Sequence, residues 1–181
     1  KRKTFIQNTF LLSAGMMVSK FSFGAKNILS TVRVTADRRH FNSKIIESTI
    51  AEFQKNVTNQ ELGWLFNNCF PNTLDTTVYD ESTNDQKLTY VITGDIDAMW
   101  LRDSSAQVCR TYISCIGQKL QDLILGLINK QSKCINIDPY AKAFYNDPNK
   151  KGEWFSDHTE MKAGIHERKW EIDSLCYPIR L

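Results

Sequence analysis

The pattern of hydrophobic and polar positions along the chain predicts amphipathic helices with one β-hairpin between them. Apolar residues recur at helical spacing in residues 41–57, 59–70 and 118–135, which predicts a helix in each range. Two runs rich in β-branched and aromatic residues, 76–79 and 87–93, flank a polar turn and predict a hairpin. The pattern therefore indicates a mainly α protein built from helical hairpins.

Three further segments extend this pattern. Residues 104–116 predict a helix that we expect Asp103 to cap, because its carboxylate can accept hydrogen bonds from free N–H groups. Residues 139–164 are polar, with prolines and glycines, and predict a long loop with little regular structure. Residues 169–181 begin another apolar helix, whose apolar side chains need packing partners. We therefore expect the chain to be part of a longer protein.

Residues 1–25 have the features of an export signal. A basic start precedes an apolar run too short to span a bilayer, and small residues follow it. A buried amphipathic first helix is the alternative interpretation. If the signal is real, the mature chain has no membrane span, works in the periplasm or outside the cell, and continues through a linker at residues 26–40.

Composition narrows the classes of function. The 181 residues suffice for one domain with a core, and 41% hydrophobic with 24% charged residues is typical of a soluble globular protein. The net charge of +3 is small and most of the charges are scattered, which argues against a nucleic-acid partner. None of the 5 cysteines forms a CxxC pair, so we expect buried free thiols rather than a zinc site.

The stretch TGDIDAMWLRDSSAQV carries the most unusual concentration of charge beside apolar residues. Asp95 and Asp97 follow a predicted strand. Arg102 and Asp103 are adjacent at a predicted helix start. Carboxylates and a guanidinium can bind neighbouring sugar hydroxyls through paired, charge-assisted hydrogen bonds, and Trp100 can offer an apolar face. A structural cluster of ion pairs with a helix cap accounts for the same pattern.

Asp173 is a candidate general acid. The apolar and aromatic residues around it would disfavour its charged form and raise its pKa, as a general acid at neutral pH requires. The alternative is an aspartate that caps a helix. Metal sites have little support, because Asp95 and Asp97 lack the Gly and Glu of a calcium loop. His158 and His166 lack the spacing of a zinc protease. No phosphate-binding loop occurs either, so we expect no cofactor.

Four blocks in chain order carry a family resemblance: NNCFPNTLDTTV, TGDIDAMWLRDSSAQV, INIDPYAKAF and HERKWEIDSLCYPIRL. Together they resemble the signature blocks of glycoside hydrolase family 125, and the resemblance covers residues 41–181. It implies a metal-independent exo-α-1,6-mannosidase that takes mannose from glycans with inversion and needs no cofactor. It also implies an (α/α)6 barrel, of which residues 41–181 would be the N-terminal part of a single catalytic domain.

The resemblance also implies roles for individual residues. Asp173 matches the catalytic acid. Arg102 and Asp103 would hold the hydroxyls of the terminal mannose, Trp100 would shape the pocket wall, and Asp95 would belong to the same substrate-binding set. The family's catalytic base is a glutamate in the C-terminal half of the barrel, so we assign no base here and expect residues 1–181 alone to be inactive.

Two other functions stay open at this point. One is a glucoamylase-like inverting barrel enzyme that acts on α-glucosides. The other is a truncated, non-catalytic mannose-binding fragment or pseudoenzyme that keeps Arg102 and Asp103 without a base. The partner in each case is an oligosaccharide, and the sequence predicts no oligomeric state.

Overall fold

The computed structural model describes residues 29–112 and 117–181. The chain separates into residues 1–30 and a larger unit of residues 31–181, which is described below. The expected export signal at residues 1–25 lies outside the described residues. Within the described ranges, no helix combines the length and the apolar character needed to cross a membrane.

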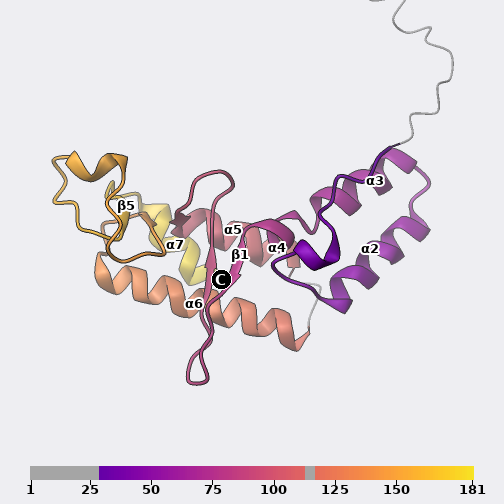
Figure 1. Ribbon diagram of the computed structural model, residues 1–181, viewed down its shortest axis with the longest axis horizontal. Helices are drawn as coiled ribbons and strands as arrows, with labels where there is room; N and C mark the ends of the chain where they lie inside the picture. Colours follow the sequence, from indigo (N-terminus) through magenta and orange to yellow (C-terminus); the bar gives the residue numbers. More distant parts are fainter. Residues whose placement is uncertain (1–28, 113–116) are drawn as a thin grey trace, which may run out of the picture. The chain divides into compact units, whose positions relative to one another are not determined.

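Helices contain about half of the described residues (Figure 1). Three of them, α2 (Lys44–Asn56), α3 (Gln60–Cys69) and α6 (Gln118–Ile137), confirm the helices predicted from apolar spacing. The others are α4 (Asn72–Thr76), α5 (Leu101–Tyr112) and α7 (Ile172–Arg180), with short 3-10 turns η2 (Ala36–Arg38) and η3 (Glu153–Ser156).

The predicted hairpin is confirmed. Strands β1 (Val78–Asp80) and β2 (Thr89–Val91) pair antiparallel, with Val78 opposite Val91. Helix α6 packs against β2 at Gly126, where an added Cβ would lie 2.9 Å from the backbone carbonyl carbon of Leu88. Real Cβ atoms do not come this close, so only glycine permits the contact.

A second sheet corrects the expectation that residues 139–164 have little regular structure. Strand β4 (Ala143–Phe144) lies between β3 (Met99–Trp100) and β5 (Ile165–Glu167), and both pairings are antiparallel. Turn η3 also lies in that stretch. A two-residue strand is too short to show a periodicity of two, which explains why the pattern did not predict β3 or β4.

The start of α5 differs from the prediction. The helix begins at Leu101, directly after β3, and the Leu101 N–H donates to the carbonyl of Lys142 at 3.0 Å. Asp103 therefore lies in the first turn rather than at the capping position. Its carboxylate faces the guanidinium of Arg102 instead of free backbone N–H groups.

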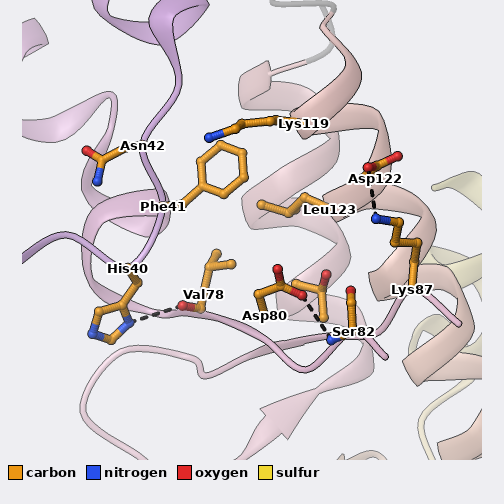
Figure 2. Close-up of a pocket in the computed structure, with 11 residues that line it drawn as sticks. His40, Phe41, Asn42, Val78, Asp80, Ser82, Lys87, Lys119, Asp122 and Leu123 are labelled. Atoms are coloured by element: carbon orange, nitrogen blue, oxygen red, sulfur yellow. Dashed lines mark hydrogen bonds and ion pairs between the residues drawn. The ribbon is translucent and has the colours of Figure 1, made fainter. Parts of the chain in front are cut away.

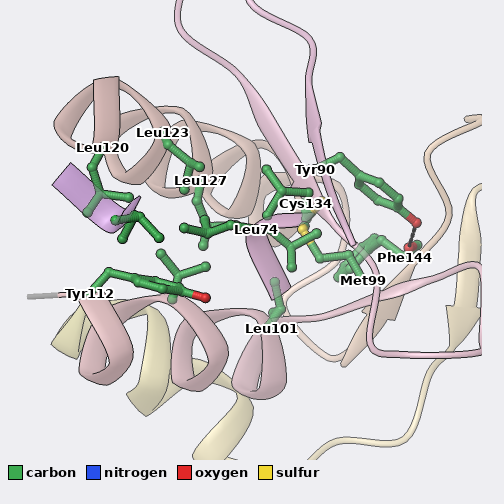
Figure 3. Close-up of a cluster of buried hydrophobic side chains, with 14 of the residues drawn as sticks. Leu74, Tyr90, Met99, Leu101, Tyr112, Leu120, Leu123, Leu127, Cys134 and Phe144 are labelled. Atoms are coloured by element: carbon green, nitrogen blue, oxygen red, sulfur yellow. Dashed lines mark hydrogen bonds between the residues drawn. The ribbon is translucent and has the colours of Figure 1, made fainter. Parts of the chain in front are cut away.

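The core lies between α5, α6 and the two sheets (Figure 3). Leucines along one face of α6 point toward Leu101 and Tyr112 of α5, as the apolar spacing predicts. The Tyr90 hydroxyl donates to the Phe144 carbonyl at 3.0 Å and links the two sheets. Cys134 is a buried free thiol, as expected, and burial raises its pKa to about 12. Cys69 and Cys176 are also free thiols, but the expectation that they are buried is wrong, because both are exposed.

Residues 31–40, part of the predicted linker, are held against the helices. The backbone N–H groups of Val32 and Arg33 donate to Asn68 Oδ1 at 3.0 and 2.9 Å. The Arg33 guanidinium also donates to the Asp75 carboxylate at 2.6 and 3.2 Å, and the two side chains are only 5% and 3% exposed. This part of the linker is therefore anchored.

Gln131 of α6 fixes the start of α5. Its buried side-chain amide donates to the Leu101 carbonyl at 3.2 Å and to the hydroxyls of Ser104 and Ser105 at 2.9 Å each. Ser104 in turn donates to the Trp100 carbonyl at 2.6 Å. One side chain of α6 thus bonds with the first turn of α5, which contains Arg102 and Asp103.

Replacing this amide should loosen the first turn of α5. We expect Gln131→Leu to lower the free energy of unfolding by about 1–3 kcal/mol, because buried polar groups lose their donor. Gln121→Leu is the matched control on an exposed position of the same helix and should change it by less than about 0.5 kcal/mol. Urea unfolding measures the free energy of unfolding of both variants. Equal effects of the two substitutions would contradict this role of Gln131.

Candidate functional site

Arg102 is the centre of a cluster of carboxylates from two helices. Its Nη1 donates to Glu171 Oε2 at 3.0 Å and to Asp173 Oδ2 at 3.1 Å, and its Nη2 lies 3.4 Å from Asp103 Oδ2. The hydrogen bond with Asp173 raises the pKa of Arg102. The guanidinium side chain remains 34% exposed, so a ligand can reach it. The structure thus brings together three of the residues predicted from sequence.

Local structure explains how these side chains meet. Arg102 and Asp103 lie in the first turn of α5, and α5 packs against α7. Glu171 occupies the position before α7, and Asp173 lies in the helix's first turn, where the free N–H groups favour a negative charge. The alternative reading of Asp173 as the capping residue is therefore wrong, because Glu171 holds that position.

The surroundings of Asp173 differ from the apolar setting expected from the sequence. Its side chain is 43% exposed and accepts a hydrogen bond from Arg102. Trp170 and Cys176, two of its expected apolar neighbours, are themselves exposed. The described residues therefore place Asp173 in a charged, open environment.

The cluster continues through Lys142, a residue that the sequence did not single out. Its ammonium lies 2.7 Å from Glu171 Oε1 and 3.4 Å from Glu167 Oε2. Lys169 binds the other oxygen of Glu167 at 2.9 Å. Burial acts to raise the pKa of Glu167, but the hydrogen bond from Lys169 and the charge of Lys142 outweigh it and lower that pKa. The ion pairs thus form a continuous series from Asp173 to Lys169, in which carboxylates and cations alternate.

Trp100 is held from one side by a buried histidine. Its ring meets the ring of His166 edge-on, with the centroids 4.9 Å apart. The Nδ1 atom of His166 lies 2.6 Å from the Tyr145 hydroxyl. Burial raises the pKa of Tyr145 and lowers that of His166, so we assign the proton to the hydroxyl, which donates to a neutral imidazole. This contact fixes one edge of Trp100, which immediately precedes α5.

Asp95 does not join the cluster. It lies exposed in the turn before β3 and forms no ion pair within the described ranges. Asp97 instead bonds with Lys150 at 2.8 Å. Among the described residues, neither Asp95 nor Asp97 forms an ion pair with Arg102, whereas Asp103 does.

Possible metal ligands are not grouped in the part of the chain that the structure describes: it places no three His, Cys, Asp or Glu side chains so that they could hold an ion. His158 is exposed, and His166 is bonded to Tyr145.

A separate cavity of about 350 Å³ lies between the hairpin, α6 and the segment before α2 (Figure 2). None of the residues that line this cavity belongs to the Arg102 cluster. The cavity's two carboxylates already have partners: Asp122 pairs with Lys87 at 3.1 Å, and Asp80 accepts from the Ser82 N–H at 2.9 Å. The solvent-open Arg102 cluster is the better candidate site, because it offers a guanidinium and carboxylates together.

A large part of the chain matches a known protein family. The family model described as metal-independent alpha-mannosidase (GH125) matches residues 59–181, which include all of the cluster. A Schizosaccharomyces pombe protein named meiotically up-regulated gene 157 protein is 36% identical over 154 residues, covering 79% of this chain and 30% of its own length.

A solved structure is also similar. It belongs to a Streptococcus pneumoniae protein described as one of a family of metal-independent alpha mannosidases, in a non-productive complex with alpha-1,6-mannobiose. The TM-score is 0.69 at 38% sequence identity, and the match covers 78% of this chain and 33% of that one. The chain thus spans about a third of the length of these relatives.

The buried His166 should make the protein less stable in acid. Burial lowers its pKa below the ordinary value of 6.5, so the unfolded chain binds this proton more readily than the folded one. The stability that neutral His166 provides is fully present above pH 6.5. It falls as the pH drops below 6.5 and passes through the pKa that His166 has in the folded protein. We expect His166→Gln to flatten the fall in unfolding free energy between about pH 7 and pH 5.

Urea unfolding at several pH values measures this effect. His158→Gln is the matched control, since His158 is exposed, and it should leave the pH dependence of stability unchanged. An unaltered slope in His166→Gln would contradict the assignment of a neutral, buried imidazole.

Proposed function

This chain belongs to the GH125 family of metal-independent α-mannosidases, and from that premise we propose that it is part of an exo-acting α-1,6-mannosidase. The enzyme would remove terminal mannose from glycans with inversion. The α-1,6-mannobiose bound to the similar Streptococcus pneumoniae protein supports this choice of sugar and linkage. Its fold would be an (α/α)6 barrel, with residues 41–181 as the N-terminal part.

The observation that carries the proposal is the solvent-open guanidinium of Arg102 among three carboxylates. Such groups bind neighbouring sugar hydroxyls through charge-assisted hydrogen bonds. We assign Arg102 and Asp103 to the hydroxyls of the terminal mannose and Trp100 to the wall of the pocket. We also assign Asp95 to the substrate-binding residues, on the family resemblance. It lies outside the Arg102 cluster, but its carboxylate is exposed and available to a ligand.

Asp173 would be the general acid. It would donate a proton to the glycosidic oxygen as that bond breaks, while water attacks the sugar from the opposite face. In an inverting enzyme the base that activates this water stands about 6.5–9.5 Å from the acid. The bond from Arg102 would stabilise the carboxylate that Asp173 becomes after it has given up its proton. The family's description as metal-independent supports a mechanism that relies on carboxyl groups.

No residue of this chain is assigned as the base. We propose that a glutamate elsewhere in the full-length protein supplies it, and that residues 1–181 alone do not hydrolyse the substrate. We also propose that residues 1–25 direct export to the periplasm or the extracellular space, on the order of basic, apolar and small residues there.

A second candidate function is mannose binding without catalysis. It is favoured by the Arg102 cluster, which needs no base to bind a sugar. Calorimetry separates the two functions: heat of binding for α-1,6-mannobiose without release of mannose by the native protein would favour the binding module.

Removing the acid should abolish turnover but not binding. We expect Asp173→Asn in the native full-length protein to lower kcat on α-1,6-mannobiose by at least about 100-fold, because a positioned acid contributes that much. Binding of the disaccharide should remain detectable by calorimetry. Asp85→Asn, at an exposed position in the hairpin turn, is the matched control and should turn over normally. Near-normal turnover by Asp173→Asn would show that another residue is the acid.

A substrate panel distinguishes this enzyme from a glucoamylase-like one. We expect the protein to hydrolyse α-1,6-linked mannosides at least about 100-fold faster than the corresponding α-glucosides. A site that hydrogen-bonds to the hydroxyls of one sugar leaves some of its own polar groups unpaired when a sugar with differently arranged hydroxyls binds. Release of free sugar, measured by chromatography, reports both rates. Equal rates on both sugars would reject the mannose-specific reading of the cluster.

A further inference from the structure

We propose that Lys142 is a positioning residue for Arg102 and acts through Glu171. This inference rests on the proposed function of the Arg102 cluster as the mannose-binding site. Lys142 touches neither Arg102 nor Asp173 in the ion pairs of the described structure, so its role would be indirect.

The Glu171 carboxylate is held by one cation at each oxygen. Oε1 accepts from Lys142 at 2.7 Å, and Oε2 accepts from Arg102 at 3.0 Å. Because Lys142 occupies Oε1, Glu171 does not form the bidentate pair that a free carboxylate makes with a guanidinium. Arg102 therefore donates to Glu171 through Nη1 alone, and the same nitrogen also donates to Asp173.

This arrangement leaves other donors of Arg102 available. A guanidinium has five N–H donors, and the hydrogen bonds of Arg102 with described residues all come from Nη1. The Asp103 carboxylate is farther away, at 3.4 Å from Nη2. Donors on Nε and Nη2 can thus point to sugar hydroxyls, provided that Glu171 stays where Lys142 holds it.

Lys142 is itself fixed by its place in the fold. Its backbone N–H donates to the Glu167 carbonyl at 3.1 Å, and its carbonyl accepts from the Leu101 N–H at 3.0 Å. Its side chain is only 12% exposed. It therefore joins β5, the first residue of α5 and the residue before α7, which are the elements that carry the cluster.

Loss of the ammonium has a specific consequence. Without it, Glu171 is free to rotate and to take two donors of Arg102, which draws the guanidinium away from Asp173 and from the sugar. Since Arg102 would hold hydroxyls both before and during the reaction, the loss should appear mainly as a higher KM.

The test uses the native full-length protein and α-1,6-mannobiose. We expect Lys142→Met to raise KM by about 10-fold or more, and Lys142→Arg, which keeps the charge, to restore most of the wild-type value. Lys133→Met is the matched control: Lys133 is exposed on α6, forms no ion pair in the described part of the chain, and should leave KM unchanged. Thermal unfolding of each variant verifies that the fold is kept.

A double substitution separates positioning from general damage. If Lys142 acts through Glu171, then Lys142→Met should add little to the effect of Glu171→Gln on KM, because both break the same link. Additive effects, or a Lys142→Met enzyme within about twofold of wild type, would overturn the inference.

Other outcomes are equally decisive. If Lys142→Met does not fold, Glu171→Gln alone tests the link from its other end, and an unchanged KM in that variant overturns the inference. A wild-type protein that releases no mannose from the disaccharide refutes the proposed function instead. The two failures are thus distinguishable by the wild-type assay.

Discussion

The position of the candidate site depends on how helix α6 holds the start of α5. Gln131 reaches from α6 to the Leu101 carbonyl and the two serine hydroxyls of the first turn, in a place from which water is excluded. On another face of the same helix, Gly126 allows the hairpin to approach closely. Because Arg102 and Asp103 directly follow Leu101, any displacement of this turn would move the centre of the carboxylate cluster.

Two arginines in this protein have different physical roles. Arg33 and Asp75 are almost fully buried, and such a pair is strongly destabilising to break because it leaves an uncompensated charge. The ion pairs of Arg102 are one third or more exposed, and pairs of that kind contribute little to stability. We therefore interpret the Arg33 pair as an anchor of the N-terminal segment and the Arg102 cluster as a group kept open for a ligand.

Elements with strong periodicity could be predicted from the sequence, whereas those fixed by distant contacts could not. Helices α2, α3 and α6 followed from their apolar spacing, but β3 and β4 are two-residue strands whose partners lie far away in the chain. Asp103 was expected to cap α5, because the local pattern did not reveal that the chain enters the helix directly from a strand. Nothing local marks Lys142, whose role arises from its contacts with Glu171 and Glu167. The family resemblance predicts that Asp173 is the acid, and its surroundings proved to be charged rather than apolar.

We propose that the Arg102 cluster binds the terminal mannose in this member of the metal-independent α-mannosidase family. A crystal structure of the native full-length protein, with Asp173 changed to Asn and soaked with α-1,6-mannobiose, tests it most directly. We expect a mannose ring whose hydroxyls bond with Arg102 and Asp103 and whose glycosidic oxygen lies beside residue 173. A sugar bound in the cavity beside Phe41, with the Arg102 cluster empty, would contradict it.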